Sequence, residues 1–151
     1  MRVDYNMKKI MITDIKWSDT ANSSSASPFY ASSPAAGFPA PGDDLVKKML
    51  NVNDLLVKHP ATTFFVRVEG DSMEGAGIFS GDILVVDRSE NAISGKIVIA
   101  AVNGELVVKR LAKVEGQLLL MSENEAYAPI VIGEAEECFV WGVVTGSVRQ
   151  F

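Results

Sequence analysis

Residues 62–87 read TTFFVRVEGDSMEGAGIFSGDILVVD and decide the fold class of the chain. The segment 62–69 alternates and is rich in β-branched and aromatic residues, which is typical of a strand. A turn-prone segment follows at 69–78, and ILVVD at 83–87 resumes the β pattern. The pattern therefore predicts strands joined by a glycine-rich turn in the middle of the chain.

The β pattern continues to the end of the chain. Further predicted strands are KIVIAAV (96–102), ELVVKRL (105–111), QLLLM (117–121), PIVI (129–132) and ECFVWGVVTGSV (137–148). Asn103-Gly104, which lies between two of them, predicts a tight two-residue hairpin. Short strands at this spacing, without long helices, predict a mostly β fold with a compact, folded antiparallel β-sheet domain.

The first forty or so residues have a different composition. Residues 18–42 are dominated by Ser, Ala, Pro and Gly, and such a segment cannot bury enough apolar surface to offset its ordering entropy. We therefore expect a flexible N-terminal arm at 1–42, with a short strand at 10–17, followed by one domain at 43–151.

One or two short helices are expected at the start of this domain. Asp43 and Asp44 open a stretch with spaced leucines, and Pro60 ends it. Asn51 or Asn53 is the expected helix cap within that stretch.

The composition argues against several classes of protein. The chain of 151 residues is 48% hydrophobic, which is enough for the core of one domain with a tail. Its net charge of -5 argues against a protein that grips nucleic acid by bulk charge, so we expect no direct sequence-specific DNA binding. No apolar run is long enough for a membrane span. The single cysteine, Cys138, fits a reducing cytoplasm.

Few residues are available for catalysis by histidine or cysteine. The only histidine, His59, directly precedes Pro60, and a surface or capping role is favoured over a Ser-His-Asp triad. One histidine and one cysteine exclude a metal site built from His and Cys clusters, and no P-loop is present. Cys138 lies in the strand-like ECFVW, where we expect a buried structural thiol. We therefore expect neither a metal nor a cofactor.

Ser72 lies in the turn Gly70-Asp71-Ser72-Met73, directly after the predicted strand at 62–69. Gly70 allows a sharp turn, so the serine hydroxyl can point outward and neighbouring amides can bind a developing oxyanion. An ordinary Asp-Ser turn is the alternative interpretation, and these residues alone do not decide between the two.

Lys109 lies in the second strand of the predicted hairpin, beside Arg110. Alternation groups Lys109 with Val107 and Leu111 but also with Glu105, so the pattern does not assign a buried face. A solvated lysine has a pKa of about 10.4 and is a poor base near neutral pH. Burial lowers a lysine pKa, and a neutral lysine can take a serine proton. The alternative interpretation is that Lys109 is not a base and simply lies at the edge of a strand.

Three segments together carry a family resemblance: 66–89 (VRVEGDSMEGAGIFSGDILVVDRS), 95–111 (GKIVIAAVNGELVVKRL) and 122–132 (SENEAYAPIVI). They resemble the LexA/UmuD family of self-cleaving serine proteases (peptidase family S24), over roughly residues 36–150. The chain is more similar to the UmuD branch than to the repressors, because its first forty residues lack the pattern of a helix-turn-helix head.

The resemblance implies specific roles. Ser72 matches the family nucleophile, Lys109 matches the general base, and Ala36-Gly37 matches the bond that is cut. It also implies a homodimer, activation by a RecA filament on single-stranded DNA, and a trimmed product that serves a UmuC-type Y-family polymerase subunit. These partners belong to translesion synthesis and SOS mutagenesis, the SOS response to DNA damage.

Three alternatives remain open at this point. A non-catalytic module, either a dimeric polymerase accessory or a regulatory binding protein, would carry Ser72 and Lys109 as relics. A signal-peptidase-like enzyme shares Ser-Lys chemistry but normally needs a membrane anchor. A phage-type repressor fragment is disfavoured by the missing DNA-binding head.

Overall fold

The computed structural model describes residues 11–17, 26–30, 46–133 and 137–151. Its elements are β1 (Met11–Trp17), β2 (Ala26–Tyr30), β3 (Val46–Asn51), α1 (Val52–Leu56), the 3₁₀ turn η1 (Pro60–Thr62), β4 (Thr63–Glu69), the 3₁₀ turn η2 (Glu74–Ala76), β5 (Ile83–Asp87), β6 (Ile97–Val102), β7 (Glu105–Val114), β8 (Gln117–Met121), β9 (Ile130–Val131) and β10 (Cys138–Val148). The predicted fold class, mostly antiparallel β with a few short helical pieces, is confirmed.

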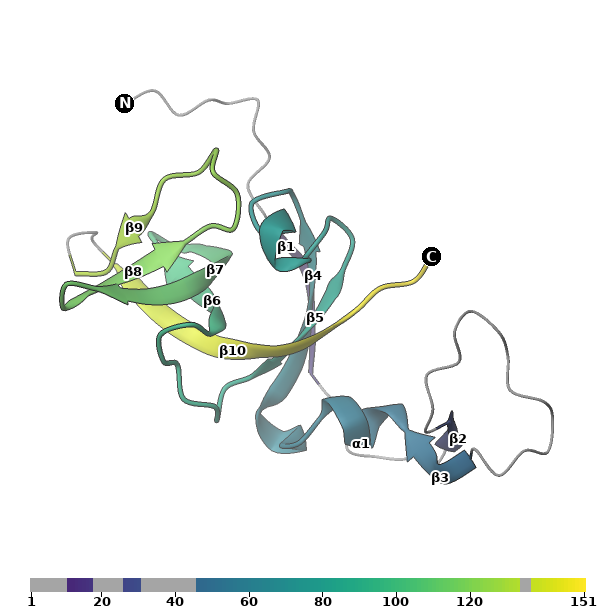
Figure 1. The fold of residues 1–151 in the computed structure, drawn as a ribbon. Coiled ribbons are helices and arrows are strands. Elements are labelled where there is room, and N and C mark those ends of the chain that lie inside the picture. The colour runs from purple at the N-terminus through teal and green to yellow at the C-terminus, as the bar shows by residue number, and fades with distance from the viewer. Residues whose placement is uncertain (1–10, 18–25, 31–45, 134–136) are drawn as a thin grey trace.

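One large sheet contains eight strands in the order β1-β4-β5-β10-β6-β7-β8-β9, and every pair is antiparallel. The long strand β10 crosses the middle of the molecule and pairs with β5 along one half and with β6 along the other (Figure 1). A Cβ at Gly142 would lie 2.7 Å from Val86 Cγ1. Only glycine fits where β10 changes partners, because β5 approaches it so closely there.

Two apolar cores lie within the curved sheet. The first contains Phe64, Val66, Val68, Met73, Ile78, Leu84, Val86, Ile99 and Val108, and the second contains Val98, Ala100, Leu111, Leu120 and Val143. β7 contributes Val108 to one core and Leu111 to the other, so both of its faces pack against apolar residues. This explains why alternation along β7 did not predict a single buried face.

The start of the predicted domain contains a strand that the sequence did not predict. Within the described part of this stretch, α1 is the one short helix, in agreement with the prediction of one or two, while residues 46–51 form β3 and pair with β2. The strand satisfies its main-chain groups across the β2–β3 ladder instead of within a helix. The cap prediction is confirmed for Asn51, whose Oδ1 accepts a hydrogen bond from Asn53 N at 2.9 Å.

The N-terminal segment contains two described strands. β1 agrees with the predicted strand at 10–17, whereas β2 lies within 18–42, where we expected a flexible arm. β2 and β3 form a separate two-stranded sheet beyond α1, apart from the large sheet (Figure 1). Ala36 and Gly37 lie outside the described residues.

The C-terminal end is fixed by an ion pair at the end of β10. Arg149 donates to both carboxylate oxygens of Asp82 at 2.7 Å, and its guanidinium lies 4.4 Å from the Phe79 ring centroid. These hydrogen bonds from Arg149 hold the pKa of Asp82 below its usual value. Across the described ranges, helices are too short and too polar to cross a bilayer.

Candidate active site

Ser72 lies in a loop, residues 70–77, that connects β4 to the rest of the sheet. Gly70 has a φ of 114°, a conformation that favours glycine and turns the chain at the end of β4. The next residue after the serine, Met73, is fully buried in the first core. Ser72 is 0% exposed, so the expectation of an outward-pointing hydroxyl is wrong in this conformation, because the packing of Met73 draws the loop inward.

Lys109 lies on β7 and is only 6% exposed. Its Nζ donates a hydrogen bond to Ser122 Oγ and lies 5.5 Å from the centroid of the Tyr127 ring. The neighbouring Arg110 is more exposed and pairs with Glu123. The ambiguity between the two basic residues is therefore resolved, because Lys109 is the more deeply buried of the two.

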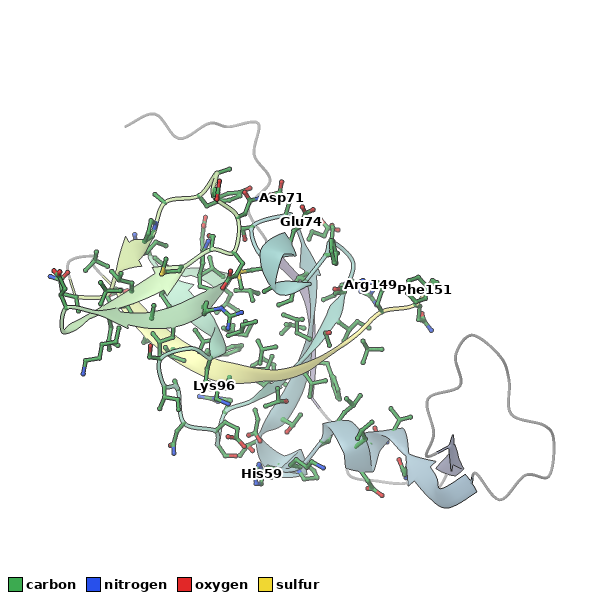
Figure 2. All side chains as sticks on the ribbon, in the orientation of Figure 1. His59, Asp71, Glu74, Lys96, Arg149 and Phe151 are labelled. Atoms are coloured by element: carbon green, nitrogen blue, oxygen red, sulfur yellow. The ribbon has the colours of Figure 1, made fainter. Side chains whose placement is uncertain are left out.

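A second loop, residues 122–129, connects the Ser72 loop to Lys109. Tyr127 donates its hydroxyl hydrogen to Asp71 Oδ1 at 2.6 Å, while its ring faces Lys109. Asn124 Nδ2 donates to the Asp71 carbonyl at 3.1 Å. One side chain, Tyr127, thus contacts both the residue before Ser72 and the amine of Lys109. Figure 2 shows Asp71 and Glu74 on the loop after β4.

The two loops approach each other closely at Gly75. The Gly75 N–H donates to the Glu123 carbonyl at 2.8 Å. A Cβ at this position would lie 2.5 Å from the same carbonyl oxygen, which is closer than real Cβ contacts come. The contact between the loops therefore requires a glycine at position 75.

The outer side of the 122–129 loop borders a hollow of about 340 Å³. Its lining includes Ser122 and Tyr127, the two residues that contact Lys109. Burial, together with the Asp71 carboxylate, raises the pKa of Tyr127 above its usual range. The phenol therefore stays protonated and remains a hydrogen-bond donor to Asp71.

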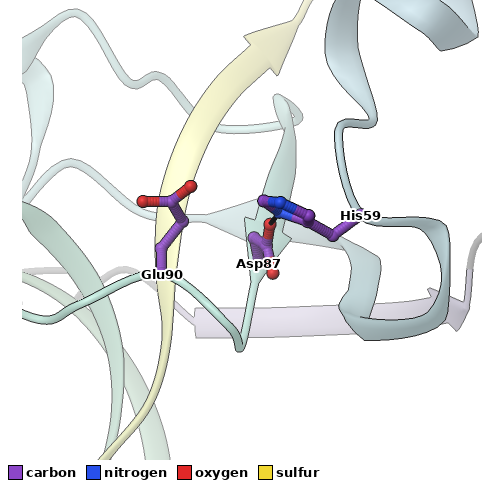
Figure 3. A group of neighbouring side chains, drawn as sticks. All are labelled: His59, Asp87 and Glu90. Atoms are coloured by element: carbon purple, nitrogen blue, oxygen red, sulfur yellow. Dashed lines mark hydrogen bonds and ion pairs between the residues drawn. The ribbon is translucent and has the colours of Figure 1, made fainter.

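A different cluster surrounds the only histidine (Figure 3). His59 Nδ1 lies 2.6 Å from Asp87 Oδ2, and the other Asp87 oxygen accepts hydrogen bonds from Thr62 Oγ1, Ser89 N and Ser89 Oγ. Burial on its own raises the pKa of Asp87, but the hydrogen bonds from His59, Ser89 and Thr62 outweigh it and lower that pKa to about 2. The Asp87 carboxylate is therefore ionised at neutral pH.

The His59 cluster does not have the geometry of a catalytic triad. Ser89 Oγ lies 3.2 Å from His59 Nδ1, the same nitrogen that binds Asp87, whereas a triad uses the two ring nitrogens for the two partners. His59 precedes β4 and Ser72 follows it. This strand of seven residues is about 23 Å long. His59 is therefore not the base for Ser72.

The same cluster also places possible metal ligands together. Ligand atoms of His59, Asp87 and Glu90 lie within 4.8 Å of one another, a grouping that a count of His and Cys alone did not consider. Both Asp87 oxygens already accept hydrogen bonds from protein groups. We therefore interpret the cluster as a structural junction between η1 and the end of β5.

Several residues of the site could not be identified from the sequence. Ser122, Tyr127 and Gly75 had no predicted role, although the first two lie within the segment 122–132 that carried the family resemblance. The contacts of Tyr127 with Asp71 and of Gly75 with Glu123 join segments about fifty residues apart, and Ser122 contacts Lys109 across 13 residues. Spacing along the chain does not reveal such pairs.

Comparison with known proteins places the chain. The peptidase S24-like family matches residues 28–145. Protein MucA of Salmonella typhimurium is 41% identical over 141 residues, which cover 93% of this chain and 96% of MucA. Protein ImpA of the same species is 45% identical over 124 residues, 82% of this chain and 83% of ImpA. The LexA repressor of Pectobacterium carotovorum subsp. carotovorum is 36% identical over 117 residues, 77% of this chain and 57% of the repressor. The chain therefore belongs to the peptidase S24 family of self-cleaving serine peptidases.

Proposed function

We propose that Ser72 and Lys109 form a Ser-Lys dyad with which this chain cuts its own Ala36-Gly37 bond. The observation that carries the proposal is the burial of Lys109 at a site that Tyr127 joins to Asp71, the residue before Ser72. Burial disfavours the charged form of a lysine, and only the neutral amine can act as a base. Family membership supports a serine peptidase independently of this geometry.

The reaction follows from the chemistry of these two groups. Ser72 Oγ attacks the carbonyl carbon of Ala36 while its proton passes to Lys109 Nζ. The bond to the Gly37 nitrogen then breaks, and Lys109 returns the proton to that leaving amine. Water hydrolyses the resulting ester between Ser72 and Ala36, which frees a product that begins at Gly37.

The oxyanion of this reaction needs main-chain donors near Ser72. Two amides of the loop are already engaged, since Glu74 N–H donates to the Asp71 carbonyl and Gly75 N–H donates to the Glu123 carbonyl. We propose that main-chain amides at or near Ser72 bind the oxyanion.

The proposed cut has two possible routes, within one chain or between two copies. The Ala36-Gly37 bond lies in the chain between β2 and β3, and this pair of strands lies apart from the large sheet. Ser72 of the same chain or Ser72 of a second copy could attack this bond. A rate that rises with protein concentration would identify the second route.

We further propose that the trimmed chain, residues 37–151, is a dimeric accessory subunit of a Y-family translesion polymerase of the UmuC type. A RecA filament on single-stranded DNA would stimulate the cut during the SOS response. The family resemblance supports these roles, and the division into an arm at 1–42 and a domain at 43–151 belongs to the same proposal.

Incubation of the purified full chain at mildly alkaline pH tests the dyad. We expect a slowly accumulating fragment that mass spectrometry shows to begin at Gly37, with faster cleavage as the pH rises. Ser72→Ala and Lys109→Ala should each abolish it. Ser147→Ala and Lys113→Ala, which change exposed residues, are the matched controls. Cleavage of Ser72→Ala at the parental rate would refute the nucleophile assignment.

The non-catalytic binding module is the competing function. It predicts a chain that stays intact at every pH, with or without RecA, an ATP analogue and single-stranded DNA. An intact parent chain under all of these conditions would favour it over the peptidase. Cleavage without any stimulation by RecA would leave the dyad in place and argue against SOS control.

A further inference from the structure

β1 is an edge strand of the peptidase sheet. Among the described strands of the large sheet, it pairs with β4 alone, and it also packs beside β7. Its register with β4 runs antiparallel from Met11 opposite Glu69 to Trp17 opposite Phe64, with one irregularity between Ile12 and Asp14. β1 therefore covers the main-chain edge of the strand that leads directly to Ser72.

Along the chain, the proposed cut lies after β1 and before every other strand of the large sheet. β1 and β2 precede Ala36, whereas β3, β4 and all later strands follow Gly37. Before the cut, the tether keeps β1 near β4 at an effective concentration on the order of millimolar. After the cut, only the β1–β4 and β2–β3 pairings and the packing of β1 beside β7 hold the N-terminal piece in place, and dilution in solution favours its loss.

The uncovered edge would be a strong template for another strand. β4 reads TFFVRVE, with β-branched and aromatic residues and no proline. Such an edge pairs readily with an added extended chain, and native proteins usually cover or interrupt it. Arg67 is exposed on β4, and the residue opposite it in the β1 register is Asp14.

We propose that cleavage converts the β4 edge into a docking site for an extended strand of a partner protein, which replaces β1. This inference rests on the proposed cut at Ala36-Gly37. β1 itself shows what the site accepts: an antiparallel segment of about seven residues with free main-chain N–H groups and an acidic residue opposite Arg67.

The test separates the docking site from self-cleavage. A Ser72→Ala full chain receives a recognition sequence for an added, sequence-specific protease between Ala36 and Gly37, so the cut no longer depends on the dyad. After cutting, we expect hydrogen exchange at the β4 amides to accelerate at least about tenfold. A labelled peptide spanning residues 11–17 should bind the cut chain at least about tenfold more tightly than the uncut chain and should restore β4 protection.

Two peptide variants report the mode of binding. Ile15→Pro in the peptide removes a main-chain donor and should abolish binding, while Asp14→Lys should weaken it several-fold. Unchanged β4 protection after the cut, or equal peptide affinity for cut and uncut chains, would overturn the proposal. Self-association of the cut chain that the peptide competes away would also overturn it, since the occupant would then be a second copy.

Discussion

Two groups of polar residues lie at opposite ends of β4, and each includes a serine, an acidic residue and a basic residue. The His59 cluster, which contains His59, Asp87 and Ser89, precedes the strand, and the Ser72 site follows it. Figure 2 shows His59 and Asp71 far apart at these two ends. By residue type the first cluster resembles a catalytic triad, whereas the second does not.

Burial and geometry instead favour the Ser72 site over the His59 cluster as the candidate for catalysis. The His59 side chain is 53% exposed, and its contacts with Asp87 and Ser89 use one ring nitrogen. Ser72 and Lys109 are buried, and Lys109 donates a hydrogen bond to the neutral hydroxyl of Ser122. A neutral partner and exclusion of water allow an amine to lose its proton, while the Asp87 carboxylate holds its cluster in one ionised state. The comparison teaches that residue type alone does not rank the two clusters, because their burial and hydrogen-bond geometry differ.

The largest expected contrast between the clusters is in cleavage rate. Lys109→Arg should lower the rate of self-cleavage by about 10³-fold, because a guanidinium stays protonated and cannot accept the Ser72 proton. His59→Gln should leave the rate within about twofold, since His59 lies a whole strand away from Ser72. Quantitative mass spectrometry of the Gly37 fragment measures both. A large loss in His59→Gln with an unchanged fold would mean that the two clusters are coupled.

The next contrast concerns the contact between the two loops of the Ser72 site. Gly75→Ala places a Cβ 2.5 Å from the Glu123 carbonyl, and we expect it to lower the free energy of unfolding by about 2–3 kcal/mol. Gly146→Ala is the matched control, because its Cβ would meet only an ordinary contact at 3.6 Å. Urea unfolding compares the two variants. Equal stability would show that the loops separate easily.

A third prediction tests the ionised state of the His59 cluster. The folded-state pKa of Asp87 is about 2 against an ordinary value of 3.8, so its contribution to stability is present above the ordinary value and is lost as pH falls toward 2. This amounts to about 2 kcal/mol between pH 5 and 2. Urea unfolding at pH 5, 4 and 3 should therefore show a shallower pH dependence in Asp87→Asn than in the parent. Equal slopes would place the acid sensitivity elsewhere, for example at Asp82.

The sequence predicted the strands well because their signals are local. Alternation and turn residues placed β5 and β8 at their observed bounds, and the Asn103-Gly104 turn joins β6 to β7. The strand at 46–51 was not predicted because its structure depends on pairing with β2, a distant segment. Lys109 burial was undecided for a related reason, since curvature of the sheet packs both faces of β7.

The candidate site shows the same division. Ser72 and Lys109 were identified because their motifs resemble a family, but the residues that contact Lys109 and Asp71 were not. Tyr127 and Ser122 act through contacts that form only when the 122–129 loop folds over the sheet. The burial of Ser72 also depends on the tertiary packing of Met73, which a turn motif does not encode.

The smallest expected effect concerns the positioning of Lys109 by Ser122. Ser122→Ala removes the hydroxyl that accepts the Lys109 hydrogen bond, and we expect cleavage to slow about tenfold while the free energy of unfolding changes by only about 1 kcal/mol. Ser122→Thr keeps a hydroxyl and should restore most of the rate. The rate of self-cleavage is also measured from pH 7 to 10, because a purely structural role of Ser122 would leave the shape of the pH–rate profile unchanged. If Ser122 positions the base, the shape of the pH–rate profile changes in Ser122→Ala and returns in Ser122→Thr. If the two variants are equally slow with parental profiles, the hydroxyl only packs against Lys109.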